Sequence, residues 1–312
     1  MKSSSADAGK LLDLAGLDAK TLHDPDAAHV VIHENTVLGS NTVPGLHIEA
    51  VSLPDGVKAT LRVEKGKIIK KPVHLCFGVV PKTGTQRIIM EAFMEENSRA
   101  SILAHCVFPF AEDVRHLMEG TIHIAKGAWY SYYERHIHSP QGGIKVYPKA
   151  SVTVEEGGTF TTEFELLKGR VGLIDIDYEV TCRKDAVMEM VARISGTGDD
   201  VIKIQETGHL LGENARGVLR SKIAVRDDAR AEIYNKMTAS APYARGHVDC
   251  KEIVQDRAKA MAVPVVEVNH PRAHITHEAA IGSVDSKQLE TLLARGLTED
   301  EAVELIIQGM LS

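Results

Sequence analysis

The sequence predicts a mainly β protein, a right-handed parallel β-helix with short helical segments at its N- and C-termini. Two observations lead to this prediction. A short motif recurs at steps of 14 or 15 residues through the second half of the chain. Aromatic residues make up only 4% of the 312 residues, so the core must be built from Val, Ile, Leu and Ala, which suits a thin, repetitive architecture.

In each repeat a polar residue, usually followed by Ala, precedes an alternating apolar stretch. This pattern indicates a turn followed by a short strand. Such a unit cannot bury its apolar face alone, but stacked copies can, with two repeats in each coil of about 28–29 residues. A β-sandwich of hairpins is the alternative, and we favour the β-helix because one period persists over seven units. The units align at Ala186, Asp200, Ala215, Ala229, Ala244, Ala258 and Ala273, and a similar spacing appears earlier at Ala100, Val114 and Ala128.

The ends of the chain break this pattern. Residues 9–22 have the pattern of a short amphipathic helix, so we expect an N-terminal helical segment over 1–24 and a β-helix core over 25–283, with clear repeats from about residue 90. Two capping-box patterns, beginning at Asp285 and Thr298, flank Gly296. They predict a helical hairpin over 284–312, with helices at Ser286–Ala294 and Glu299–Gly309, as a docking element for a partner.

Charge and motif content exclude several classes of function. The net charge is −7 with the signs well mixed, so no basic patch suggests nucleic acid or an anionic membrane surface. The apolar runs are too short to span a membrane, and the N-terminus has no apolar signal core, so we expect a cytoplasmic protein. The chain contains no GxxxxGK[ST], GxSxG or HExxH motif, so we expect neither ATP binding by this chain nor an enzyme of those types. Its four cysteines form no CxxC pair, and no disulfide framework is expected.

One group of residues has the composition of a metal site. His277 and Glu278 follow Cys250 by about 27–28 residues, close to one coil of the repeat. We therefore expect Cys250 to lie beside one of them on the adjacent rung, about 4.8 Å away. Thiolate, imidazole and carboxylate together suit iron or zinc. Successive side chains of a strand point to opposite faces, so His277 and Glu278 face opposite ways and Cys250 contacts only one of them directly. The alternative is a core cysteine and a solvated His-Glu pair.

A weaker candidate metal pair lies nearer the middle of the chain. His136 and His138 are two residues apart, so they point to the same face of a predicted strand. Two histidines placed in this way can bind a metal, although histidines of this kind more often lie on the surface or pack in the core. Cys106 and His123 have no evident partner in the sequence.

The chain resembles the SufB/SufD family of iron–sulfur cluster assembly scaffolds, most clearly towards its C-terminus. The resemblance rests on GHVDCKEIV, VPVVEV and ITHEAAIGSVDSKQLETLLARGLTEDEA, with a further likeness at 214–217, and covers roughly residues 90–312. Cys250 matches the cysteine of the B-type, Glu278 its glutamate, and His277 the histidine that both types share. Cys182 lies near the position of a further B-type cysteine, but the residues around it do not align, so it is not assigned that role.

The resemblance implies both an activity and partners. It implies a minimal B-like scaffold for de novo iron–sulfur cluster assembly and transfer, in which Cys250, His277 and Glu278 hold a transient [4Fe-4S] or [2Fe-2S] cluster. Family members have a parallel β-helix with helical ends. The resemblance further implies a homodimer formed through the β-helix, a SufC-type ABC ATPase bound at the C-terminal helices, and recipient apo-proteins. Two alternatives are a D-like partner that supports the complex or iron entry without holding the cluster, and a β-helix enzyme acting on carbohydrate.

Overall fold

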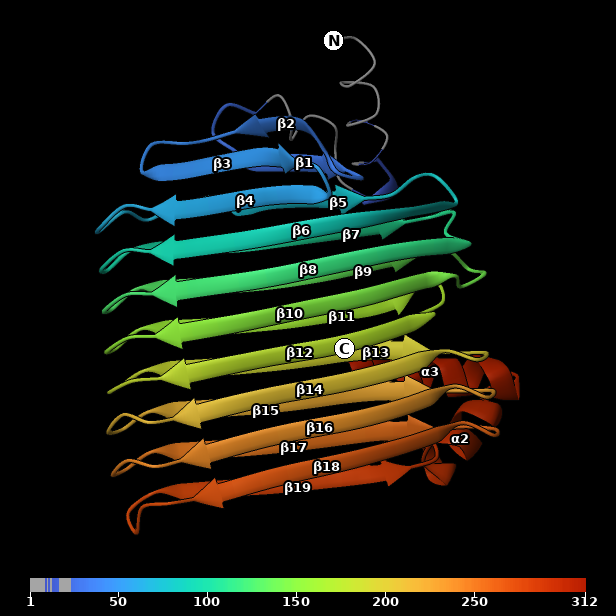
Figure 1. Cartoon of the computed structure of the whole chain (residues 1–312). Coiled ribbons are helices and arrows are strands. Elements are labelled where there is room, and N and C mark those ends of the chain that lie inside the picture. The colour runs from blue at the N-terminus through green and yellow to red at the C-terminus, as the bar shows by residue number, and fades with distance from the viewer. Residues whose placement is uncertain (1–8, 10, 12, 17–23) are drawn as a thin grey trace.

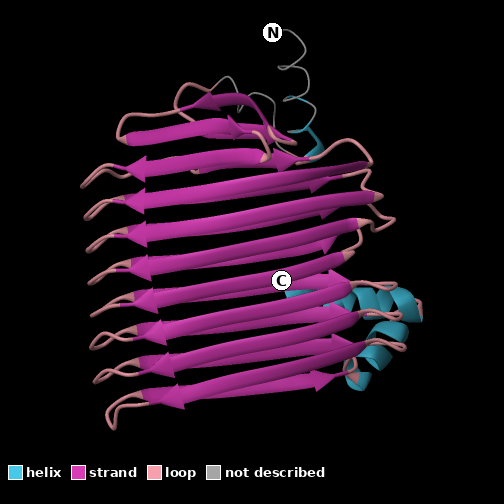
Figure 2. Cartoon of the chain, viewed as in Figure 1, coloured by secondary structure: helices cyan, strands magenta, loops and turns pink. Residues whose placement is uncertain are grey.

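The computed structural model describes residues 9, 11, 13–16 and 24–312. Over these residues the chain winds into a β-solenoid of about 8 turns, with two helices at the C-terminal end. Figure 1 shows the strands stacked as a ladder from the N-terminal to the C-terminal end, and Figure 2 shows that the helices lie to one side of it. The predicted mainly β, coiled architecture is confirmed.

Two facing sheets form the solenoid, and the chain alternates between them from β4 onward. The first sheet has the order β19-β17-β15-β13-β11-β9-β7-β5-β1-β2 and the second has the order β18-β16-β14-β12-β10-β8-β6-β4-β3. The strands of the first sheet are β1 (His29–His33), β2 (Thr36–Asn41), β5 (Val73–Gly78), β7 (Arg99–Phe108), β9 (Trp129–His138), β11 (Thr159–Lys168), β13 (Val187–Gly196), β15 (Arg216–Val225), β17 (Arg245–Val254) and β19 (His274–Gly282). Those of the second are β3 (Leu46–Leu53), β4 (Gly56–Val63), β6 (Thr83–Met94), β8 (Asp113–Ile124), β10 (Ile144–Val154), β12 (Leu173–Cys182), β14 (Val201–Leu210), β16 (Arg230–Ala239) and β18 (Lys259–Val268).

Neighbouring coils stack in parallel register, and the length of a coil changes along the solenoid. The sequence separation of directly paired residues is 30 for Arg135 and Glu165, 28 for Glu165 and Arg193, and 29 for His247 and Thr276. Successive side chains on a strand point alternately inward and outward. The inward positions of both sheets form one continuous hydrophobic core dominated by Ile, Val, Leu, Met and Ala.

Small residues close the corners between strands. Ala186, Ala215 and Ala244 are fully buried, and each backbone N–H donates to the carbonyl three residues earlier. The residue before each of them has a positive φ, which turns the chain sharply. At one corner Asp200 replaces Ala, and its carboxylate accepts hydrogen bonds from the backbone N–H groups of residues 171, 172 and 197. The aligned motif thus marks the corners, as the sequence predicts.

Antiparallel pairs begin the solenoid. β1 pairs with β2, and β3 pairs with β4, before the parallel coils start. Of the helix predicted over 9–22, the described residues 9, 11, 13 and 14 are helical, and its other positions lie outside the described residues or beyond the helix. Leu11 is 1% exposed and packs against Val31 and Cys76 on the outer face of the first sheet.

The C-terminal hairpin consists of α2 (Ser286–Leu293) and α3 (Glu299–Leu311). Asp285 caps the first helix, and a complete capping box between Thr298 and Glu301 starts the second. Both helices start where the sequence predicts and end close to the predicted positions. Within the described part of the chain, no helix is long and apolar enough to cross a membrane.

The hairpin is fixed to the outer face of the first sheet. Ile307 and Leu311 of α3 are buried in a small apolar cluster that includes Ala224 of β15, with Ile253 of β17 packed against it. Arg193 of β13 donates to the Leu311 carbonyl over 2.8 Å. These contacts place α3 behind the strands that carry the candidate site described below.

Candidate functional site

Cys250 faces the interior of the solenoid near its C-terminal end. Strand β17 places Val248 and Cys250 on the inward face, and both are 0% exposed. The Asn235 side chain donates a hydrogen bond from Nδ2 to the Cys250 sulfur over 3.7 Å. Burial raises the pKa of Cys250, so the free thiol is neutral near pH 7 and becomes a thiolate when a metal replaces its proton.

Glu252 is a further inward polar residue, which is not among the site residues predicted from the sequence. It lies just beyond Cys250 on the same face of β17, is 3% exposed, and accepts a hydrogen bond from Ser221 Oγ over 3.3 Å. Burial raises the pKa of Glu252 to about 7, and its Oε2 has no hydrogen-bond partner. Every second side chain of a strand points to the same face, so a strand that turns Cys250 inward also turns Glu252 inward. This alternation can be read from the sequence.

The structure corrects the expected neighbours of Cys250. In the pairing of β17 with β19, Cys250 lies opposite Ala279, while His277 and Glu278 lie opposite residues that precede Cys250. The prediction that His277 or Glu278 stacks directly beside Cys250 is therefore wrong. The physical reason is the length of the last coil, in which paired residues have a sequence separation of 29. This separation is larger than the spacing from Cys250 to either residue.

His277 and Glu278 nevertheless face opposite sides of the sheet, as predicted. His277 pairs with Val248 and Glu278 pairs with Asp249. Partners in a parallel ladder share a face, so His277 shares the inward face of Val248 and Cys250, and Glu278 shares the outward face of Asp249. His277 is displaced from Cys250 both across one strand and along it, which separates their backbone positions by roughly 8 Å. Cys250 and His277 thus line the same interior, and Glu278 lies on the outer surface.

These residues occupy an open end of the solenoid. Among the described residues, β19 and β18 are the last strands of their sheets and no further coil covers them. His277 and Glu278 are exposed, and Ile281 and Val268 are 47% and 48% exposed. Cys250, one coil further in, is covered only by this last coil.

His136 and His138 lie deep inside the solenoid, on one face of β9 as predicted. They are 1% and 4% exposed. His136 Nε2 lies 2.8 Å from Glu134 Oε1, and its Nδ1 lies 3.0 Å from His138 Nε2. Burial lowers the pKa of each imidazole to about 3, so both rings are neutral near pH 7. They do not join Cys250, because several strands of the same sheet separate β9 from β17.

The expectation for Cys106 also changes. The sequence shows no partner for it, but its thiol donates a hydrogen bond to Glu134 over 3.5 Å. His123, in contrast, points outward from β8 and is exposed. All four cysteines are free thiols, as predicted.

Comparisons with known proteins place the chain in a family. Residues 85–310 match the family model described as "SUF system FeS cluster assembly, SufBD core domain". The chain belongs to the SufBD family. Over 282 residues it is 40% identical to an iron–sulfur cluster assembly SufBD family protein of Methanocaldococcus jannaschii, covering 90% of this chain and 89% of that protein. It is 33% identical over 296 residues to a SufBD family protein of Pyrococcus horikoshii, covering 95% and 90%.

SufBD membership connects this protein to iron–sulfur cluster assembly, in which family members are assembly components. The iron–sulfur cluster assembly protein SufB of Bacillus subtilis is 30% identical over 69 residues, which cover 22% of this chain and 15% of that protein. The region that matches the family model runs from β6 to α3 and contains both Cys250 and Cys106 with their neighbours.

Proposed function

We propose that this SufBD protein is a scaffold on which an iron–sulfur cluster is assembled and from which it is transferred. One observation supports this most directly. A buried thiol, Cys250, lies among polar side chains one coil inside an open end, and an imidazole on the same inward face, His277, stands at the opening. A thiolate provides soft ligation for iron, and imidazole or carboxylate provides weaker ligation. Such a mixed set suits a cluster that has to leave, whether it is [4Fe-4S] or [2Fe-2S].

The polar surroundings of Cys250 fit this chemistry. Glu252 and Ser221 share its inward face on β17 and β15, and Asn235 reaches it from β16 in the facing sheet. In an apolar core such groups are costly unless they are paired, and Glu252 Oε2 and Asn235 Oδ1 have no partner. Iron or sulfide entering beside Cys250 would interact with these groups.

The open end suits a second copy of the same chain. β19 exposes an unpaired backbone edge and contains no proline, whereas the neighbouring terminal strand β18 carries Pro264 in its middle. Antiparallel pairing of two β19 strands about a two-fold axis near Glu278, the middle of the strand, would bring His277 and Glu278 of both copies together. The two Cys250 thiols would then lie on either side of the same interface, where a shared cluster would gain ligands from both protomers.

The hairpin suits the docking of a SufC-type ABC ATPase. α2 has no buried residue, and a groove with apolar walls runs between the two helices, lined in part by Leu292, Leu305 and Met310. Ile253, on the strand that carries Cys250, packs on the inner side of the same hairpin. Movement of the helices by the ATPase would therefore reach β17 directly and could expose the buried thiol.

Reconstitution of the purified protein with ferrous iron and sulfide, without oxygen, tests the proposal. We expect a visible absorption band that Cys250→Ala removes. Cys182→Ala is the matched control, because Cys182 is also 0% exposed inside the solenoid but lies on β12, away from the open end. A band of equal strength in the Cys250→Ala protein would contradict a scaffold role for Cys250.

A D-like supporting role is the second candidate. It is favoured by the register, which places Asp249 rather than Cys250 opposite Glu278, and by the complete burial of the thiol. In that case the chain would bind the ATPase and recipient partners normally, while Cys250→Ala would leave cluster assembly by the complete complex unchanged.

A further inference from the structure

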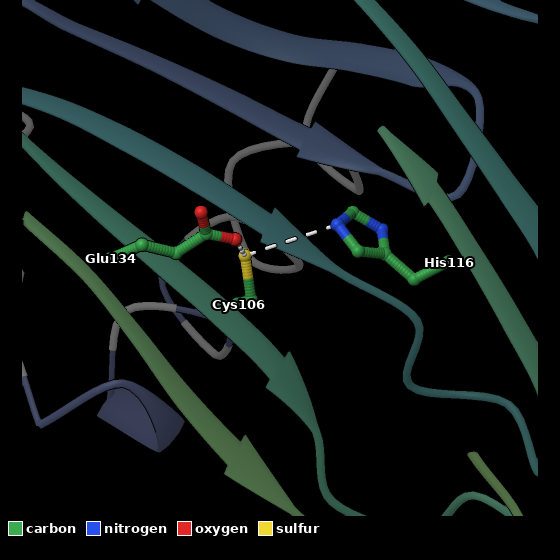
Figure 3. A group of neighbouring side chains, drawn as sticks. All are labelled: Cys106, His116 and Glu134. Carbon is green, nitrogen blue, oxygen red and sulfur yellow. Dashed lines mark hydrogen bonds between the residues drawn. The ribbon is translucent and has the colours of Figure 1, made fainter. Parts of the chain in front are cut away.

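A second group of potential ligands lies inside the solenoid, far from the open end. Cys106 of β7 and Glu134 of β9 come from one sheet, and His116 of β8 comes from the facing sheet. Figure 3 shows the three side chains converging across the interior. Cys106 and His116 are 0% exposed and Glu134 is 1% exposed. Five strand spacings separate β7 from β17, so this group lies roughly 24 Å from Cys250.

The distances among the three are close to those of a metal site. Cys106 Sγ lies 3.5 Å from Glu134 Oε1 and 4.0 Å from His116 Nε2, and the three ligand atoms all lie within 4.8 Å of one another. In a tetrahedral site with zinc-to-ligand bonds of about 2.0–2.3 Å, neighbouring ligand atoms are about 3.2–3.6 Å apart. Contractions of at most about 1.5 Å between these atoms, through side-chain rotations, would close the site around an ion.

Several polar atoms of this group have no partner. Among the described residues, Glu134 Oε2 and His116 Nδ1 are buried and make no well-formed hydrogen bond, and the hydroxyls of Tyr132 and Tyr178 lie near the Glu134 carboxyl group. Gln86 pairs with His116 on the adjacent strand β6, and its Oε1 is also without a partner. Unpaired buried polar atoms cost free energy. A metal at His116 Nε2 would fix the ring proton on Nδ1, the side of a metal-bound imidazole that commonly donates to a further acceptor. Gln86, on the paired position of β6, is a candidate for that acceptor.

Hydrogen bonds show where the protons of this group lie. The Arg170 carbonyl can only accept, so His138 donates to it from Nδ1 over 3.0 Å. The Nε2 atom of the neutral His138 then accepts from His136 Nδ1, which leaves His136 Nε2 with a lone pair directed at Glu134. The proton between His136 and Glu134 therefore belongs to the carboxyl group. The metal-free group thus holds two exchangeable protons, one on Glu134 and one on Cys106.

We propose that Cys106, His116 and Glu134 bind one divalent transition-metal ion of the zinc or ferrous type inside the solenoid. Binding exchanges the thiol proton and the carboxyl proton, which leave to solvent, for one doubly charged ion, so the charge of the buried group does not change and no electron is transferred. Loss of the carboxyl proton frees the Nε2 lone pair of His136, which lies 2.8 Å from Glu134 Oε1 and is available as a further ligand. Its Nδ1–H remains held by His138, the arrangement common around metal-bound histidines.

Measuring the metal content of the purified protein tests the proposed site directly. The full chain carrying Cys250→Ala, so that the open end cannot contribute its thiol, is produced in zinc- or cobalt-supplemented medium and, in parallel, refolded with Co²⁺ alone to overcome the burial of the site. We expect about one ion per chain after gel filtration. We also expect a thiolate-to-cobalt charge-transfer band and the intense visible bands of tetrahedral Co²⁺.

Variants in the same background assign the ligands. Cys106→Ser, which nearly preserves volume, is expected to remove the charge-transfer band, and Glu134→Gln to lower retained metal at least tenfold. Cys182→Ala, which removes an equally buried thiol, is expected to keep both the metal and the band. A folded Cys250→Ala chain that takes up no metal by either route would overturn the site. If the Cys106→Ser protein kept both its metal and its charge-transfer band, the proposed site would be overturned as well. Neither result bears on cluster assembly at Cys250.

Discussion

Two groups of polar side chains interrupt the apolar interior, and a single acid lies between them. The first surrounds Cys106 and the second surrounds Cys250. Glu206 of β14 pairs with Tyr178 on one side and with Asn235, the neighbour of Cys250, on the other. It is 2% exposed, and its Oε2 has no hydrogen-bond partner. An acid in such a place is tolerated because it keeps its proton.

Glu206 makes the stability of the fold depend on pH. Burial raises the pKa of Glu206 from 4.5 to about 8. Below pH 4.5 both the folded and the unfolded chain hold the proton. Between pH 4.5 and 8 only the folded chain does, so the free energy of unfolding falls as the pH rises, by a total on the order of 4 kcal/mol for this group. Glu206→Gln is therefore expected to be more stable than the parent protein at pH 8.

Urea unfolding at pH 5 and pH 8 measures this difference. The gain from Glu206→Gln should be large at pH 8 and small at pH 5. Glu232→Gln, on the exposed outer face of β16, is the control and should change stability little at either pH. An equal effect of Glu206→Gln at both pH values would show that Glu206 is ionised in the folded protein.

At the scale of elements, the strands and corners from Ala186 onward and the two C-terminal helices were predictable from the sequence, whereas the regular strands between Ala128 and Ala186 were not recognisable as repeats. Ala186 and Ala215 mark corners because only small residues fit there, and Asp285 and Thr298 mark helix starts because their side chains cap backbone N–H groups. The neighbours of Cys250 were less predictable. A corner that gains or loses a single residue leaves the repeat recognisable but shifts every contact between rungs. In different coils of this one chain the sequence separation of paired residues is 28, 29 or 30.

The Cys106 group shows a second limit. Glu134 follows Cys106 by close to one coil, but the pairing places His136 directly opposite Cys106, with Glu134 diagonal to it. His116 joins from the other sheet, and no fixed spacing in the sequence relates positions across the interior. Contacts within a sheet follow from the coil length, whereas contacts between sheets need the three-dimensional structure.

The helical hairpin has a buried face and an exposed face, and the proposed function places ATPase docking on the exposed one. Ile307 faces the solenoid and is 1% exposed, whereas Leu305 lines the groove and is 48% exposed. We expect Leu305→Asp to weaken binding of the ATPase by tenfold or more, because a charge in an apolar contact typically costs over about 1–2 kcal/mol, while leaving the fold intact. Isothermal titration calorimetry, in which the variant is titrated into the purified ATPase, measures this affinity.

Gln308→Asp is the matched control for this titration. It places the same charge on the same helix at an exposed position that does not line the groove. Equal affinity of the ATPase for Leu305→Asp and the parent protein would show that the groove is not its docking site.

The solenoid has two unlike ends. Antiparallel pairs close the N-terminal end, whereas β18 and β19 leave the C-terminal end open, with exposed apolar residues and free backbone edges. Natural proteins rarely leave such an edge uncovered. The open end, the buried thiol behind it and the hairpin packed on the same strand lie close together, and the proposed function assigns cluster assembly, dimerisation and ATPase docking to this one region.

Native mass spectrometry of the protein reconstituted with iron and sulfide is the sharpest test of a cluster shared by two chains, because it counts chains and clusters in the same particle. We expect two chains carrying one cluster, and loss of that cluster in the Cys250→Ala protein. A cluster carried by a single chain, or a dimer of Cys250→Ala chains that keeps its full cluster, would contradict it.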